Sequence, residues 1–187
     1  MKKKKKKEEN VLILDFLAHG YVEDDQPLHK KKSLAQGIGV DGFTLLELVP
    51  KKGVHLQPLE KAYIGDGKRE KIHHINGRIP FGKLTSTAEA ELEHALKEII
   101  EEKEDEFINF FNRAQPLNTR THVLQMLPGV GKKHLEKIVE ERRVEDFKSF
   151  KDLKERVPMM PEPQKAVSQR ILKEIKEEEK HNLFVGK

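Results

Sequence analysis

Short apolar runs divided by glycine- and proline-containing turns dominate the chain from residue 10 to residue 83. The runs are V11-L-I-L-D-F-L17, G42-F-T-L-L-E-L-V49, K61-A-Y-I64, E70-K-I-H-H-I75 and R78-I-P-F-G82. Turn sequences follow three of them, namely PKKG at 50–53, G65-D-G67 and N76-G77. Such runs between such turns are typical of strands, so this half predicts a small barrel or sandwich. The polar segment E23-D-D-Q-P-L-H-K-K-K32 predicts an exposed loop.

The pattern changes to helical spacing from residue 86. S86-T-A-E89 has the spacing of a capping box, and apolar residues follow with helical periodicity at Ala90, Leu92, Ala95, Leu96, Ile99 and Ile100. This predicts a long helix or a broken pair in a linking segment at 84–115, with the acidic run at 98–106 on a solvated face. Apolar positions farther along predict four more helices, near 119–126, 132–143, 147–157 and 165–179. These four helices make an all-α domain at 116–187.

Composition narrows the class of protein. Hydrophobic and charged residues each make up 36% of the 187 residues, and there is no Cys. The lack of Cys excludes disulfides and thiolate chemistry, and the Lys- and Glu-rich composition fits a cytoplasmic protein of a thermophile. No apolar run is long enough for a membrane span or a signal peptide. The formal net charge of +4 equals the charge of residues 1–9, which carry six Lys and two Glu, so we expect a disordered basic tail there.

A small basic turn lies in the helical domain, within L124-Q-M-L-P-G-V-G-K-K-H-L-E-K-I-V-E-E-R142. A proline ends one helix, Gly129 and Gly131 allow backbone conformations closed to other residues, and Val130 can be held by the core. The next helix begins at once, so its free N–H groups face out of the turn beside Lys132 and Lys133. This combination predicts a cradle for one backbone phosphate, without base reading. The alternative is a plain tight turn between two helices.

The sequence L127-P-G-V-G131 followed by a basic helix resembles the helix-hairpin-helix motif of DNA-repair and RNA-processing proteins. That motif binds the sugar-phosphate backbone, and the resemblance implies the amides of Gly129, Gly131 and Lys132 as donors. A second copy is suggested by the sequence FKDLKERVPMMP at 150–161, which precedes another helix. Because Met and Pro replace the glycines there, and Pro lacks an N–H, we expect the second turn to complete the core rather than to bind.

Over nearly its full length the chain also resembles an uncharacterised archaeal family that joins an OB-like barrel to such a helical module. The shared features are the N-terminal strands, H73-H-I-N-G-R78 and L127-P-G-V-G131. The resemblance implies an α+β fold of two subdomains, an OB-like β-barrel at 10–83 and an all-α paired helix-hairpin-helix domain. It also implies nucleic-acid binding, with RNA preferred to DNA.

Four residues of the barrel half are candidates for a second contact surface. OB-folds bind single strands by pairing stacking aromatic side chains with a basic groove. Tyr63 and Phe81 are the stacking candidates, because the other phenylalanines of this half lie within apolar runs. Arg69 and Arg78 lie among loop lysines in a way that suits a phosphate-tracking groove. The alternative for these basic residues is the charged surface of a thermophile protein.

Three other patterns resemble ligand-binding motifs, but none of them predicts a ligand here. G37-I-G-V-D-G42 matches a dinucleotide fingerprint, but the run after it is a strand pattern rather than a helix pattern. G65-D-G-K68 lacks the spacing and the Ser or Thr of a P-loop. His73 and His74 are expected to point to opposite faces of a strand, which makes them a poor metal pair. We therefore expect no cofactor, no metal and no catalytic residue.

The sequence predicts a non-enzymatic nucleic-acid-binding protein, with the turn at 127–131 on a phosphate and the barrel as a second surface. One alternative is a DNA-binding repair or processing accessory or a nuclease-like enzyme, which a perturbed carboxylate or His in a cleft beside the turn favours. The other is a protein-protein interaction module, which an exposed apolar patch beside an obstructed turn favours.

Overall fold

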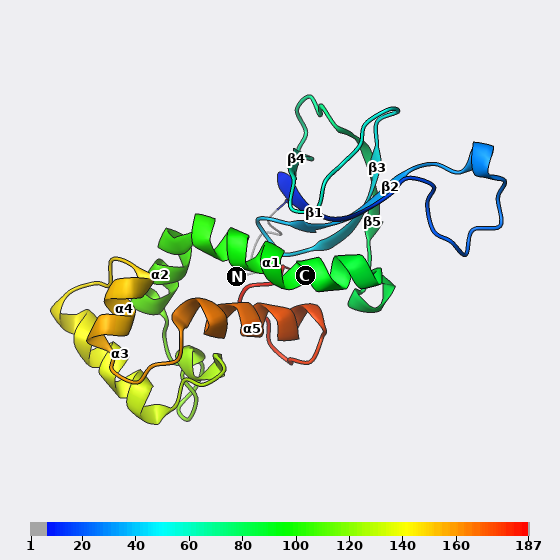
Figure 1. Cartoon of the computed structure of the whole chain (residues 1–187). Helices are drawn as coiled ribbons and strands as arrows, with labels where there is room; N and C mark the ends of the chain where they lie inside the picture. The colour runs from blue at the N-terminus through cyan, green and yellow to red at the C-terminus, as the bar shows by residue number, and fades with distance from the viewer. Residues whose placement is uncertain (1–6, 187) are drawn as a thin grey trace. The chain divides into compact units, whose positions relative to one another are not determined.

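Five antiparallel strands form one curled sheet in the computed structural model, which describes residues 7–186 (Figure 1). The strands are β1 (Asn10–Leu17), β2 (Leu34–Gly39), β3 (Leu45–Pro50), β4 (Lys61–Tyr63) and β5 (Ile72–Arg78). Their order in the sheet is β4-β1-β2-β3-β5, and every neighbouring pair is antiparallel. The register shifts once between β1 and β2 and twice between β3 and β5. Such irregularities increase local twist, so they help the sheet to curl.

The sheet is covered on both faces. Its inner face holds an apolar cluster made of Val11, Ile13, Ala35, Leu46, Leu48, Leu56, Ala62, Ile64 and Ile72. Leu12, Leu14 and Ile38 point the other way and are also buried. Strands buried on both faces have continuous apolar runs instead of alternation, which explains the sequence of β1.

A polar stripe crosses the second face of the sheet. Gln36 is fully buried, and its side chain accepts a hydrogen bond from the Thr85 N–H over 2.9 Å. The Thr85 hydroxyl donates to Asp15 over 2.6 Å. Tyr21 donates to Glu47, and burial together with this hydrogen bond raises the pKa of Tyr21 to about 12. The stripe is therefore occupied by contacts within the chain.

Strand β2 was not predicted from the sequence, because L34-A-Q-G-I-G39 contains two glycines. Pairing with β1 on one side and β3 on the other makes it a strand. A side chain at Gly37 would lie 2.5 Å from Cγ2 of Val11, so glycine is needed there for close packing. The predicted strand at 78–82 is wrong: it is the last residue of β5 and the start of a 3-10 helix, η2 (Phe81–Lys83), which follows Pro80.

Residues 8 and 9, placed by the sequence in a disordered tail, are bound to the sheet unit. The Glu8 carboxylate accepts hydrogen bonds from the N–H groups of Asp41 (2.8 Å), Gly42 (2.9 Å) and Thr44 (3.1 Å). Two of these amides belong to the dinucleotide-like sequence and the third follows it, so a carboxylate of the chain itself occupies them. Positions 1–6 of the expected tail lie outside the described residues.

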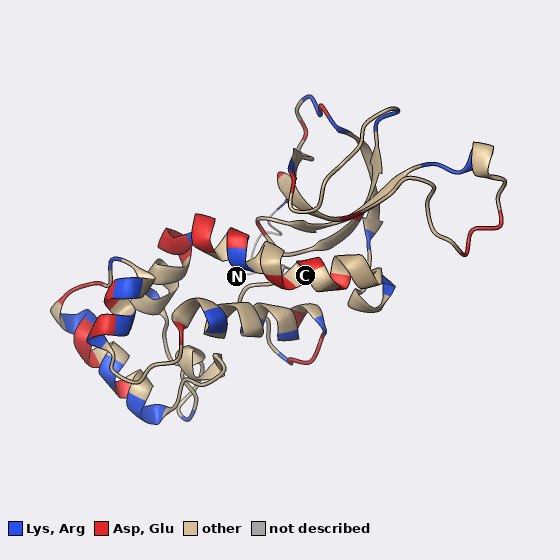
Figure 2. Ribbon diagram, in the orientation of Figure 1, with Lys and Arg blue, Asp and Glu red and all other residues tan. Residues whose placement is uncertain are grey.

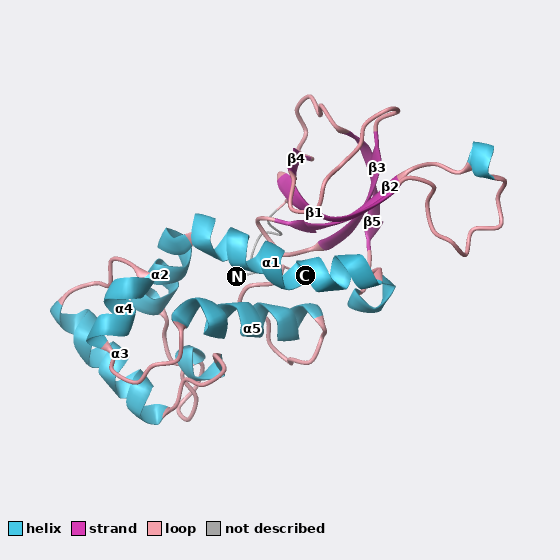
Figure 3. Cartoon of the chain, in the orientation of Figure 1, coloured by secondary structure: helices cyan, strands magenta, loops and turns pink. Residues whose placement is uncertain are grey.

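The helices are α1 (Ser86–Glu102), α2 (Glu104–Arg113), α3 (Lys132–Val144), α4 (Phe150–Arg156) and α5 (Pro163–Ile175), with 3-10 helices η1 (Leu28–Lys30) and η3 (Val123–Met126) (Figure 3). The broken pair expected at 84–115 is α1 and α2, which meet at Lys103. The helix expected at 119–126 is only the four-residue η3, which His122 caps. The last helix ends at Ile175 rather than near 179, and Glu177 after it has a positive φ of 58°.

The described residues divide into two compact units. One runs to Ala95 and resumes at Lys173, so the sheet unit includes the C-terminal segment that the sequence assigned to the helical domain. The other is Leu96–Leu172. Within residues 7–186, every helix is too short or too polar to cross a membrane.

Candidate nucleic-acid interface

The first turn, Leu127–Gly131, has a tightly fixed backbone. The Val130 N–H donates to the Leu127 carbonyl oxygen over 3.1 Å, and both side chains are buried. Gly129 lies between them with φ +80°, a left-handed conformation that favours glycine. The predicted role of Val130 as the residue that fixes the turn agrees with its burial.

Only one of the two glycines needs to be glycine for backbone reasons. Gly131 has φ −90° and ψ −176°, an extended conformation that any residue adopts. A side chain there would approach only Nδ1 of His134, at 4.0 Å. A side chain at Gly129 would lie 3.1 Å from Cγ of Pro161, in addition to the strain of the positive φ. The expectation that both glycines permit special conformations therefore holds for Gly129 alone.

Free amides and cationic side chains meet at the start of α3. Lys132 and Lys133 are its first two residues, and their N–H groups precede the first intrahelical hydrogen bond, which the Leu135 N–H donates to Gly131. Both lysine side chains are exposed. The first turn of α3 has no acidic residue, and Figure 2 colours the ribbon by charge. The nearest ion pair is a long one, 4.0 Å between Lys132 Nζ and Glu136. The helix dipole adds further positive potential at this end.

His134 changes the set of donors that the sequence predicts. Its Nδ1 accepts a hydrogen bond from the Gly131 N–H over 3.2 Å, so this amide is occupied. Its Nε2 therefore carries the proton and donates to the Met159 carbonyl oxygen over 3.0 Å. The Gly129 N–H has no acceptor among residues 7–186. The donors open to a ligand thus include the amides of Gly129, Lys132 and Lys133.

The second turn, Val157–Pro161, repeats the backbone of the first. The Met160 N–H donates to the Val157 carbonyl oxygen over 3.4 Å, and both side chains are buried, like the pair in the first turn. Met159 takes the place of Gly129 and has φ +61°. The equivalence follows the alignment of LPGVG at 127–131 with VPMMP at 157–161. The two turns also touch, through Gly129 against Pro161 and through His134.

Two barrel candidates, Tyr63 and Arg69, share the turn after β4. The Tyr63 hydroxyl accepts from the Gly67 N–H over 3.0 Å, and the ring lies against Gly65. Nε of Arg69 donates to the Gly65 carbonyl oxygen over 2.9 Å. Both side chains therefore hold their own turn together, although Tyr63 remains 37% exposed.

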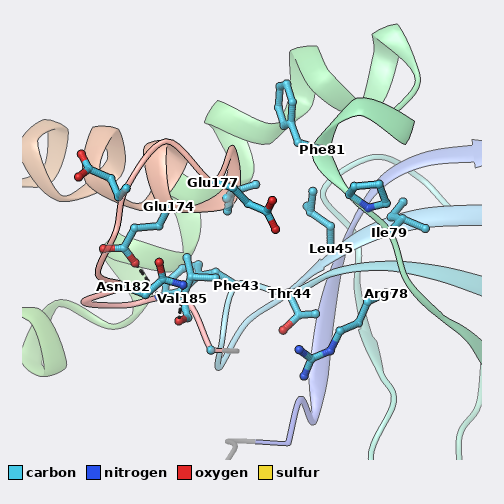
Figure 4. Close-up of a pocket in the computed structure, with 14 residues that line it drawn as sticks. Phe43, Thr44, Leu45, Arg78, Ile79, Phe81, Glu174, Glu177, Asn182 and Val185 are labelled. Atoms are coloured by element: carbon cyan, nitrogen blue, oxygen red, sulfur yellow. Dashed lines mark hydrogen bonds between the residues drawn. The ribbon is translucent and has the colours of Figure 1, made fainter.

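The other two barrel candidates, Arg78 and Phe81, line a cleft of about 620 Å³ in the sheet unit (Figure 4). The same cleft is lined by three carboxylates, Glu174, Glu177 and Glu179. Nζ of Lys176 lies 4.9 Å above the Phe81 ring, so one face of this aromatic already carries a cation. The carboxylates lower the local positive potential, which makes this cleft a weaker phosphate site than the first turn.

His73 and His74 do not alternate across the strand, so the prediction of opposite faces is wrong. The pairing of β3 with β5 skips His73, which bulges. As a result the two rings meet, with 2.7 Å between their Nδ1 atoms, and His74 also contacts Asn76 over 3.0 Å. In the described part of the chain, no three His, Asp or Glu side chains lie together as a metal site would require.

The sequence interpretation missed His134. The residue lies three positions after Gly131, the spacing at which a helix side chain reaches back to the N-cap amide. That spacing was the available signal, but His is not the usual residue at that position of a capping box.

The described structure is that of an α+β protein with a curled antiparallel half-barrel and a helical unit in which two matching turns touch. The chain belongs to the family described as "Protein of unknown function (DUF655)", whose model matches residues 7–186. The uncharacterized protein MJ0038 of Methanocaldococcus jannaschii is 39% identical over 186 residues, which cover 98% of this chain and 82% of that protein. The crystal structure of Af1531 from Archaeoglobus fulgidus matches with a TM-score of 0.90 and 38% identity, over 96% of this chain and 100% of that one. These relatives are archaeal.

Proposed function

We propose that this protein binds nucleic acid without catalysis, RNA in preference to DNA, by holding a backbone phosphate at the first turn. One observation carries the proposal: the open amides of Gly129, Lys132 and Lys133 lie beside two exposed lysine side chains, with no acidic residue in the first turn of α3. Backbone amides at a helix start are suited to phosphate oxygens, and the absent side chain at Gly129 lets a phosphate approach the backbone.

The proposed contact carries no sequence preference. It uses amides and lysines on one phosphate and offers no side chain for base edges. We therefore expect affinity to vary little with base sequence and strongly with salt. This behaviour is that of the helix-hairpin-helix motif, which the first turn resembles in sequence.

The OB-like half supplies the second surface in this proposal. The stripe at Gln36 and Glu47 is closed by contacts within the chain, so the sheet face around it contributes little. The turn that holds Tyr63 and Arg69 is a better candidate, since it has the exposed Lys68 and its carboxylate Asp66 is paired with Lys7. The preference for RNA rests on the family resemblance, and contacts to the 2′-hydroxyl are the physical basis that it requires.

A salt series tests the proposal. The full chain with the lysines at positions 2–6 replaced by Gln is titrated with single- and double-stranded RNA and DNA, so that the basic N-terminus does not dominate. Replacing Lys132 and Lys133 by Ala should reduce the slope of log K against log salt by about 2 on a duplex. The matched control replaces the exposed Lys97 and Lys151, which form long ion pairs on α1 and α4, and should reduce the slope less. Equal slopes for the Lys132/Lys133 variant and the parent protein contradict the proposal.

A further inference from the structure

Met159 is an apolar side chain held in solvent by a strained backbone. It is 94% exposed and has φ +61°, a conformation that L-residues other than Asn and Asp rarely adopt. Because the side chain is exposed, it adds no packing energy to the folded chain, and a glycine at this position would remove the backbone strain. Strained residues that packing does not reward cluster at ligand sites, which directs attention to what Met159 touches.

Met159 belongs to the same surface as the proposed phosphate site. Its carbonyl oxygen accepts the hydrogen bond from His134, whose other ring nitrogen holds the Gly131 amide. The neighbouring Pro161 packs against Gly129. These contacts fix the tip of the second turn beside the tip of the first.

The second turn cannot repeat the chemistry of the first. Glu162 and Pro163 stand where the first turn is followed by Lys132 and Lys133, so the second turn lacks both lysine charges and one of the two amides at the helix start. The flanking Lys154 and Glu162 pair with each other, so they add little net charge. What the second turn presents is the thioether side chain of Met159, which is flexible and polarizable and adapts to irregular apolar surfaces.

We propose that Met159 enters the groove of a duplex and packs against sugar and base edges next to the phosphate held by the first turn. This inference rests on the proposed function and adds its substrate class: a double-stranded segment, because only a duplex presents a groove beside the phosphate. Proteins that bind the minor groove of DNA insert apolar side chains, Met among them, into the groove. In this proposal the first turn contacts the phosphate through charge and amides, and the second turn makes an apolar contact in the groove.

Duplex RNA of about 20 base pairs, long enough to span a site with two turns, is the probe, titrated into the full chain with neutralised positions 2–6. Met159→Ala and Met159→Gln should each lower the affinity about tenfold, as expected for losing most of one buried apolar side chain. The salt slope should stay unchanged, because no charge is removed. Met159→Leu should bind like the parent protein. Val144→Ala is the matched control, since Val144 is 83% exposed at the far end of α3.

The outcomes separate this inference from the proposed function. Parental affinity in Met159→Ala, together with a reduced slope in the Lys132/Lys133 variant, overturns the role of Met159 and leaves the phosphate site intact. A tenfold loss on single strands as well as duplexes overturns the duplex assignment. If the parent protein binds none of the four nucleic acids, both the proposed function and this inference are overturned. Thermal unfolding of each variant by circular dichroism shows that the fold is retained.

Discussion

Nε2 of His134 donates a hydrogen bond to the carbonyl oxygen of Met159 over 3.0 Å, across 25 positions of the sequence. The same ring accepts from Gly131, so one side chain fastens the start of α3 to the second turn. This link holds the two turns beside each other. They share a backbone conformation but differ in the side chains that they expose.

Replacing His134 by Ala should lower the free energy of unfolding by about 1 kcal/mol, because two hydrogen bonds are lost at a partly exposed site. It should also remove the protection of the Gly131 amide against hydrogen exchange, measured by NMR. His94→Ala is the control, since His94 is exposed and contacts Glu91 at 3.4 Å on the surface of α1. Unchanged exchange at Gly131 would show that the His134 contact is not formed in solution.

Gly129 and Gly131 should respond differently to substitution. Gly129→Ala should cost about 1–2 kcal/mol of stability, because a side chain is strained at φ +80° and meets Pro161. Gly131→Ala should change stability by less than about 0.5 kcal/mol, since its backbone is ordinary and the space is open. Urea unfolding of the two variants measures the difference, and similar costs would contradict the assigned conformations.

Met159→Gly should raise the free energy of unfolding by about 0.5–1 kcal/mol. Glycine relieves the left-handed strain, and part of that gain is offset by the larger entropy that glycine has in the unfolded chain. A stabilised variant that binds duplex RNA more weakly would show that Met159 serves binding at the expense of stability. The measurement is urea unfolding alongside the titration described above. A Met159→Gly variant that is less stable than the parent protein would contradict the claim that the backbone at Met159 is strained.

His122 should make stability depend on pH. Burial lowers the pKa of His122 below its usual value of 6.5, and the nearby charge of Arg142 lowers it further. The unfolded chain therefore binds more protons than the folded one between the two pKa values, so the stabilisation is fully present above about pH 6.5 and decreases as pH falls below it. His122→Asn keeps an acceptor for the Leu124 N–H and removes the titration. The parent protein should lose stability relative to this variant as the pH falls from neutral to about 5, and parallel curves would contradict the shift.

Local signals in the sequence were sufficient for most of the strands, for α1 and for the first turn, because apolar periodicity and turn residues determine these elements. They were not sufficient for β2, whose glycines become a strand only through pairing with β1 and β3. They also gave no indication that Glu8 would fill the amides at 41–44, and the spacing of three between Gly131 and His134 was too weak a signal to predict that contact. These are contacts between side chains and distant or unusual backbone partners, and sequence periodicity carries no information on them. The bulge at His73 depends likewise on the register with β3.

The most direct test of the phosphate site is the amide NMR spectrum of the full chain, with positions 2–6 neutralised, during titration with duplex RNA. The account predicts that the amide protons of Gly129, Lys132 and Lys133 shift downfield together and become protected from exchange, as new hydrogen bonds to phosphate form. The Gly131 amide should move less, because His134 already holds it. Saturable binding that leaves these three amides unshifted, with the changes elsewhere on the chain, would contradict the central claim.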